Sequence, residues 1–390
     1  MTGLYLRRGV STFLAIGLLT VLQLVLIGSA PVPTGKSHFE LRSAGVVKLN
    51  DLSVEDAAVI DEATVVVVGT KSNKDGDEDP DRLDPNGAIV GFAEKVVRPF
   101  TNGHTARICR VSVSRGRIAT TSTGRDPVLR VWDLKAGKTV ATVEIDRPGG
   151  VSTHYGVAWF HKSDRVAVAA GKRVIVLDPG KPGEREELAI PAGSSRWVEK
   201  PTVSPDDSLL ACTADRADVV VWEMATRKGI VFSLVPDKVD DPKQWLSGGV
   251  EFGPKGMLIA WRHGSDSEVP ERQTEAETPA ERRGVVSIDR HSGRVTPLGL
   301  GTSVYTLSCA TDPTAKWLAT AGSARPDEPR SAGNTTLGEL RVYNLVTKEL
   351  AFREQVAGHP LCWVAFTPSG KRIVSASYDG VVRWWDVRGE

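Results

Sequence analysis

One acidic segment of this 390-residue chain has residue types and a spacing suited to metal chemistry. Carboxylates occupy alternate positions there, at Asp75, Asp77, Asp79 and Asp81. Such an arrangement suits a hard cation such as Ca²⁺, which takes about six to eight oxygen ligands. The match to the twelve-residue calcium loop fails where Pro80 replaces the turn glycine and Asn86 replaces the bidentate glutamate. The alternative is a solvated acidic loop, and apart from Ca²⁺ at this segment we expect no cofactor.

The histidines and cysteines add no pattern of a catalytic or zinc site. The four cysteines lie far apart in the chain and form no Cys-x-x-Cys pair. Each falls within a strand-like run, where an unpaired cysteine behaves as a small buried hydrophobe. The seven histidines show no ligand spacing, and the sequence contains no Gly-x-Ser-x-Gly nucleophile elbow. We therefore expect the protein not to be an enzyme.

The charge balance bears on the class of partner. The chain has 49 basic and 48 acidic residues, for a net charge of +1. Proteins that bind nucleic acid usually carry a clear positive excess, because they neutralise backbone phosphates. We therefore expect protein partners and no nucleic acid.

The first 38 residues differ in character from the rest. Arg7 and Arg8 precede an uncharged stretch with an apolar core at residues 10–30. A basic start followed by an apolar run is typical of a signal peptide or a signal anchor. The run is close to the roughly 20 residues that span a bilayer. We therefore assign residues 1–38 to a signal peptide or anchor helix with a Pro-rich linker. This assignment predicts an exported protein, which is either anchored in the membrane facing outside the cytoplasm or, after cleavage, periplasmic or secreted.

Beyond residue 38, short β-branched and apolar runs alternate with turns rich in Gly, Pro, Asp and Asn, a pattern that predicts β-strands. Several runs end in an aromatic residue followed by an acidic one, as in Trp132-Asp133, Trp222-Glu223 and Trp385-Asp386. Weaker copies fill the gaps between them. The resulting period of about 40–45 residues, lengthened where segments are inserted, indicates a repeat architecture.

The C-terminal unit resembles a complete WD repeat. It contains Gly358-His359, Ser377, Asp379-Gly380 and Trp385-Asp386. A second unit is similar to it and contains Gly103-His104, Asp126 and Trp132-Asp133. Other units keep little more than the strand pattern. From about residue 40 to its end, the chain therefore resembles the WD-repeat β-propeller family, in a bacterial-type form with degenerate repeats.

The resemblance implies a structural role for the motif residues. In the family, a His, a Ser or Thr, a turn Asp and a Trp form a hydrogen-bonded chain within one blade. By position these residues are His359, Ser377, Asp379 and Trp385 in the last blade, and His104, Asp126 and Trp132 in the second. The hydroxyl of the second blade is Thr121 or Thr123. A buried network of this kind rigidifies a fold when every member is bonded, so we do not interpret these residues as catalytic.

Counting four strands for each repeat predicts seven blades over residues 39–390. The last blade runs out of chain after Asp386, one strand short. Residues 39–49 are strand-like and otherwise unplaced, and in the family an N-terminal strand commonly closes the last blade. We therefore predict that residues 39–49 complete it and remove an exposed sheet edge. The predicted fold is an all-β seven-bladed propeller, acting as a monomer, preceded by the N-terminal signal or anchor helix.

Long insertions separate the second and third strands of three blades, at residues 71–87, 264–284 and 323–338. Loops on a rigid scaffold are where binding residues concentrate, although solvated insertions are the alternative. We interpret the chain as a non-catalytic protein-interaction scaffold that presents these loops on one face. Two alternatives stay open: a propeller enzyme, such as a lactonase-like hydrolase or another metal- or cofactor-dependent enzyme, and an extracytoplasmic ligand sensor.

Overall fold

The computed structural model describes most of the chain beyond residue 38. The described residues are 39–71, 85–100, 103–122, 126–145, 156–191, 197–214, 218–234, 245–264, 284–300, 305–324, 337–356 and 358–388. The predicted signal or anchor segment, residues 1–38, lies outside them. Across the described ranges, no helix has the length and apolar character needed to cross a membrane.

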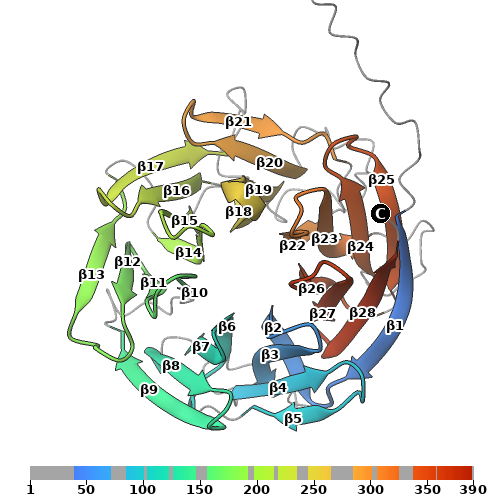
Figure 1. Cartoon of the computed structure of the whole chain (residues 1–390), viewed down its shortest axis with the longest axis horizontal. Helices are drawn as coiled ribbons and strands as arrows, with labels where there is room; N and C mark the ends of the chain where they lie inside the picture. Colours follow the sequence, from blue (N-terminus) through green and yellow to red (C-terminus); the bar gives the residue numbers. More distant parts are fainter. Residues whose placement is uncertain are drawn as a thin grey trace, which may run out of the picture. The chain divides into compact units, whose positions relative to one another are not determined.

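Seven four-stranded antiparallel sheets are arranged in a ring within the unit His38–Glu390 (Figure 1). The first blade contains β2 (Leu52–Val59), β3 (Thr64–Lys71), β4 (Pro85–Gly91) and β5 (Val97–Pro99). The second contains β6 (Ile108–Ser114), β7 (Arg117–Ser122), β8 (Val128–Asp133) and β9 (Lys138–Glu144). The third contains β10 (Gly156–Trp159), β11 (Val166–Ala170), β12 (Arg173–Leu177) and β13 (Arg185–Ala189). The prediction of an all-β seven-bladed propeller is confirmed.

The remaining blades follow the same order from the axis outwards. The fourth contains β14 (Val198–Val203), β15 (Leu209–Ala214), β16 (Asp218–Glu223) and β17 (Lys228–Ser233). The fifth contains β18 (Trp245–Phe252), the 3₁₀ turn η3 (Pro254–Gly256), β19 (Leu258–Gly264), β20 (Gly284–Asp289) and β21 (Arg294–Pro297). The sixth contains β22 (Tyr305–Thr311), β23 (Trp317–Ala324), β24 (Leu337–Asn344) and β25 (Leu350–Val356).

The seventh blade combines strands from both ends of the unit. It contains β26 (Leu361–Phe366), β27 (Arg372–Ser377), β28 (Val381–Arg388) and, as its outermost strand, β1 (Glu40–Lys48). β1 pairs antiparallel with β28, from Glu40 opposite Arg388 to Lys48 opposite Val381. The segment 39–49, which we predicted to close the ring, therefore contains the strand that supplies the fourth position (Figure 1).

The hydrophobic core lies between neighbouring blades. One cluster joins the third and fourth blades around Phe160 and Trp222, and another joins the sixth and seventh around Trp317 and Trp385. Middle strands are therefore covered on both faces, and Val65–Val68 of β3 are fully buried without alternation. Outer strands such as β13 alternate between exposed and buried positions because one of their faces meets solvent.

Candidate functional site in the central channel

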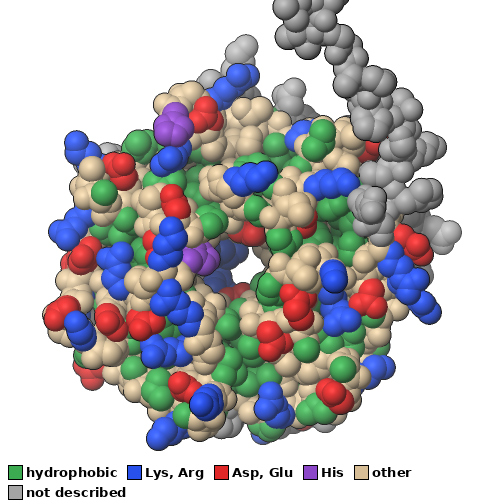
Figure 2. Space-filling model, viewed as in Figure 1, with side chains coloured by type: hydrophobic (Ala, Val, Ile, Leu, Met, Phe, Trp, Pro, Cys, Tyr) green, Lys and Arg blue, Asp and Glu red, His purple; other side chains and the backbone are tan. Residues whose placement is uncertain are grey.

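The innermost strands of the seven blades enclose a cavity of about 540 Å³ on the axis of the ring. Its walls come from β2, β6, β10, β14, β18, β22 and β26, one strand from each blade. Figure 2 shows the ring hollowed at its centre on the face in view. The volume lies within the range of roughly 300–1,000 Å³ that is usual for small-molecule pockets.

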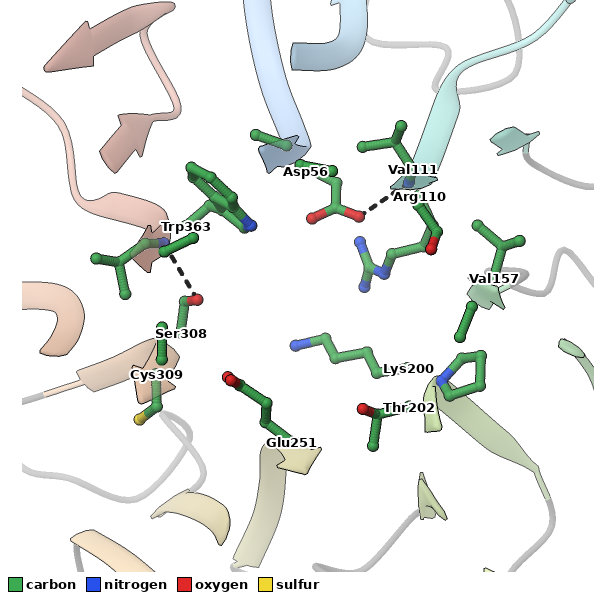
Figure 3. Close-up of a pocket in the computed structure, with 18 of the residues that line it drawn as sticks. Asp56, Arg110, Val111, Val157, Lys200, Thr202, Glu251, Ser308, Cys309 and Trp363 are labelled. Atoms are coloured by element: carbon green, nitrogen blue, oxygen red, sulfur yellow. Dashed lines mark hydrogen bonds between the residues drawn. The ribbon is translucent and has the colours of Figure 1, made fainter. Parts of the chain in front are cut away.

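Four charged side chains from four different blades enter this cavity. Asp56 comes from β2, Arg110 from β6, Lys200 from β14 and Glu251 from β18, and all four are half-buried. Figure 3 shows their charged ends directed towards the same central space. The channel is therefore a polar site built by the ring as a whole, because no single repeat supplies more than one of these four groups.

Backbone contacts orient three of these side chains. Oδ2 of Asp56 accepts the N–H of Val111 at 3.0 Å, a bond that also joins the first blade to the second (Figure 3). Nη1 of Arg110 donates to the carbonyl of Cys109 at 2.7 Å. The ammonium of Lys200 donates to the carbonyl of Gly248. These contacts hold the charges in place while leaving further donors of both cations for other partners.

Desolvation shifts the pKa values of these groups. Burial raises the pKa of Asp56, against the opposing effect of Arg110. Burial raises the pKa of Glu251 to about 8, although the backbone N–H of Thr311 acts in the other direction. Burial, and next to it the positive charge of Arg110, lowers the pKa of Lys200 to about 8. At neutral pH, Glu251 is therefore mostly protonated and Lys200 is mostly cationic.

Two thiols line the same cavity, at Cys309 and Cys362, and all four cysteines of the chain are free. Burial raises the pKa of both lining thiols. A thiol is a nucleophile only as its thiolate, so neither is activated at neutral pH. In the part of the chain that the structure describes, no group of three or more His, Cys, Asp or Glu side chains could hold a metal ion.

The sequence prediction did not include the channel residues. Asp56, Arg110, Lys200 and Glu251 are each a charged residue within an otherwise strand-like segment, in different repeats. Aligning the first strands of the repeats places Asp56, Arg110 and Lys200 at one related position, three residues before a valine, whereas Glu251 lies elsewhere in its strand.

Two of the predicted motif residues of the second blade, His104 and Asp126, meet away from this channel site. His104 is buried, and its Nδ1 lies 2.7 Å from Oδ2 of Asp126. Its Nε2 lies 3.0 Å from the hydroxyl oxygen of Thr120. Burial lowers the pKa of His104, and Asp126 opposes the shift, so the neutral ring donates from Nδ1 to the carboxylate. Trp132 is half-buried and packs edge-on against Phe100, with ring centroids 5.2 Å apart.

The hydroxyl in this network differs from the prediction. Thr120 contacts His104, whereas the sequence pattern indicated Thr121 or Thr123, and Thr123 lies outside the described residues. Successive side chains of a strand point to opposite faces, so an error of one position places the wrong hydroxyl on the His104 side.

The last blade departs further from the expected chain of hydrogen bonds. The hydroxyl of Ser377 donates to Oδ1 of Asp379 at 2.5 Å. The indole N–H of Trp385 donates to Oε2 of Glu354 at 2.9 Å, on β25 of the neighbouring blade. His359 is exposed, and within residues 358–388 no hydrogen bond joins it to Asp379. The four predicted residues are therefore not brought into one network, because the indole faces the sixth blade.

Several predicted features lie outside the described residues. Asp75, Asp77, Asp79 and Asp81, the candidate Ca²⁺ ligands, belong to residues 72–84, which the structure does not describe. Most of the three long insertions also fall there, namely residues 72–84, 265–283 and 325–336. Calcium binding and the presentation of these loops therefore stay predictions.

Comparison with known proteins bears on the family. Residues 352–386 match the family model described as WD domain, G-beta repeat. This span includes all of β26, β27 and nearly all of β28. Together with the seven-bladed ring, the match supports the WD-repeat family.

Curated proteins similar to this chain are named as ribosome biogenesis proteins. YTM1 of Chaetomium thermophilum is 26% identical over 298 residues, covering 71% of this chain and 57% of the relative. ERB1 of the same organism is 26% identical over 319 residues, covering 78% of this chain and 35% of the relative. YTM1 of Podospora anserina is 25% identical, covering 70% of this chain and 58% of the relative. The propeller thus spans between about a third and somewhat over half of the length of these relatives.

These comparisons contradict one prediction and leave part of another without support. The predicted export, with a membrane-anchored, periplasmic or secreted protein, is contradicted because the relatives are named for ribosome biogenesis. The relatives are also fungal, so the bacterial-type form of the repeats has no support. An apolar N-terminal run was too weak a signal for location, because apolar segments also occur in buried helices and other contexts.

Proposed function

We propose that this WD-repeat propeller is a non-catalytic scaffold that binds partner proteins and acts as a monomer. The observation that carries the proposal is the set of hydrogen bonds that join neighbouring blades. In the inner strands, Ser112 accepts the N–H of Trp159 and Ser308 accepts the N–H of Val364, both at 3.2 Å. A ring tied in this way holds its connecting loops in fixed positions, which favours binding through loops.

Bonds in the turns extend the same connection between blades. The carboxylate of Asp207 accepts the N–H groups of His161 and Lys162 at 2.7 and 2.8 Å, joining the fourth blade to the third. Glu62 accepts the N–H and the hydroxyl of Ser369 at 2.5 and 2.7 Å, joining the first blade to the seventh. The names of the fungal relatives support an assembly role and make ribosomal precursor particles the first partners to test.

The experiment is affinity capture with the full chain. One variant has residues 265–283 and 325–336 replaced by short Gly-Ser turns, and a matched control has residues 146–155, between β9 and β10 in the sequence, replaced in the same way. We expect the parent and the control to capture the same protein partner, and the double-loop variant to lose it while keeping its thermal midpoint. Turnover of a small substrate by the parent, with no protein captured by any form, would refute the scaffold.

A further inference from the structure

Two cations lie on the same side of the channel, one on either side of the third blade. Arg110 on the second blade and Lys200 on the fourth both enter the cavity, and Figure 3 shows them directed towards the same space. Between them, β10 of the third blade presents only Gly156, Val157, Ala158 and Trp159. The wall that separates the two cations therefore carries no carboxylate to neutralise them.

We propose that the central channel binds a small oxyanion, a phosphate or a carboxylate, between Arg110 and Lys200. The inference goes beyond the scaffold function and does not depend on it. Two like charges held near each other in a half-buried cavity raise the energy of the empty site, and an anion that bridges them lowers it. The positive charge of Arg110 lowers the pKa of Lys200, whereas Glu199 and Asp56 raise it.

The nearby carboxylates act on these two cations at longer range and form no close ion pair with them among the described residues. Across the described ranges, neither Arg110 nor Lys200 lies within 4.0 Å of a carboxylate oxygen, and each donates instead to a backbone carbonyl. Glu55 is engaged with Arg107, whose Nη1 lies 3.3 Å from its Oε1. Of the other two carboxyls at the site, Glu251 is mostly protonated at neutral pH. Asp56 and Glu199 then supply negative charge to both cations at longer range. Asp56 has the larger effect on the pKa of Arg110, and Glu199 has the larger effect on that of Lys200.

The donors at the site match an oxyanion. A guanidinium offers paired N–H groups in one plane, the geometry that suits two oxygens of a carboxylate or phosphate. An ammonium adds up to three donors from another side. Ser308 accepts the N–H of Val364, which leaves its own hydroxyl hydrogen to donate, and a protonated Glu251 offers another O–H. The ligand can be a free small anion or an acidic side chain of a partner protein that enters the channel.

Isothermal titration calorimetry on the full chain tests the proposal, at neutral pH and constant ionic strength. The probes are inorganic phosphate, citrate and a hexaglutamate peptide. Removing one cation with Arg110→Gln or Lys200→Met should weaken binding at least about tenfold, the loss typical of a charged hydrogen bond. The matched controls Arg98→Gln and Lys135→Met, at exposed positions, should bind as the parent does.

A further variant places an additional negative charge of the protein itself beside the two cations. Thr202 lines the channel near Lys200 (Figure 3), so Thr202→Asp places a carboxylate beside the cations. We expect this variant to lose anion binding and to unfold at a higher temperature than the parent. This result remains informative even if a cation-deleting variant does not fold.

The probes distinguish the two sources of the anion. Binding of phosphate or citrate that depends on both cations supports a free small anion, and binding of hexaglutamate alone supports an acidic side chain of a partner. The proposal is overturned if no probe binds, or if the cation-deleting variants or Thr202→Asp bind as tightly as the parent.

Discussion

Gly45 of β1 lies against the indole ring of Trp384, so closely that a Cβ at Gly45 would come within 2.1 Å of the ring. The contact lies beside the register shift between Ser43 and Gly45, in the strand pair that closes the propeller. The strand pair that closes the ring therefore has a position, Gly45, that accepts only glycine, because real Cβ atoms do not approach other atoms so closely.

Substitution of Gly45 by alanine should weaken the closure. We expect Gly45→Ala to lower the free energy of unfolding by about 1–3 kcal/mol, the usual cost of overpacking a well-packed site. Gly183→Ala is the matched control, because a Cβ there would meet nothing within 4 Å. Chemical denaturation of both variants measures the difference, and equal stabilities would show that the indole moves aside without cost.

The buried His104–Asp126 pair should contribute more to the free energy of unfolding than the corresponding aspartate of the last blade. Asp126→Asn removes the charged acceptor from buried His104, and we expect a loss of about 1–3 kcal/mol. Asp379→Asn is the matched change in the seventh blade, where His359 is exposed and is not bonded to Asp379, so its effect should be smaller. Similar losses in urea denaturation would contradict a special contribution of the histidine.

The bond between the second and third blades can be tested at Ser112. Ser112→Ala leaves the N–H of Trp159 without its acceptor, and we expect a destabilisation of about 1 kcal/mol. Ser114→Ala, at the end of the same strand, serves as the control. Unfolding followed by tryptophan fluorescence gives both values, and no difference between them would mean that water replaces the serine at no cost.

Glu251 should make stability depend on pH. Burial raises its pKa from 4.5 to about 8, so between these values the folded state holds a proton that the unfolded state has released. The contribution of Glu251 to the free energy of unfolding is therefore fully present below pH 4.5 and is lost as the pH rises towards 8. Cys309 and Lys200, on the two neighbouring blades, face Glu251. The lowered pKa of Lys200 makes the stability rise with pH only above about pH 8, because the folded state then releases a proton that the unfolded state keeps.

Glu251→Gln isolates this effect. The variant keeps the shape of the side chain without the ionisation, so its stability relative to the parent should increase from pH 5 to pH 8. Thermal midpoints measured over that range for the parent and for Glu251→Gln should diverge with rising pH. Parallel curves would show that the Glu251 carboxyl ionises in the folded state with little penalty.

The fold could be predicted from the sequence because each repeat carries local signals. The strand runs, the turn residues and the Trp-Asp ends recur with a period that determines the number of blades. The pairing of β1 with β28 joins segments at opposite ends of the unit. It could be inferred because one strand was left over and one blade lacked a strand.

The candidate site could not be predicted in the same way. Arg110 and Lys200 are far apart in the sequence, and their proximity depends on the curvature of the ring, which places the uncharged strand β10 between them. The exact hydroxyl beside His104 and the partner of Trp385 depend on strand register and on the stacking of neighbouring blades. A shift of the strand register by one residue moves each side chain to the opposite face of the sheet. Sequence periodicity does not determine the register to within one residue.

The pairing of β1 with β28 also has a consequence for how the protein is made. β28 is the last strand that the structure describes and follows β1 by more than 300 residues, so during synthesis β1 leaves the ribosome long before its partner exists. Until then β1 has no partner strand, and the face of the first blade that packs on the seventh has no neighbour. The ring can therefore close only after translation of this unit ends, and a nascent chain stalled before residue 381 would expose an open edge to chaperones and proteases.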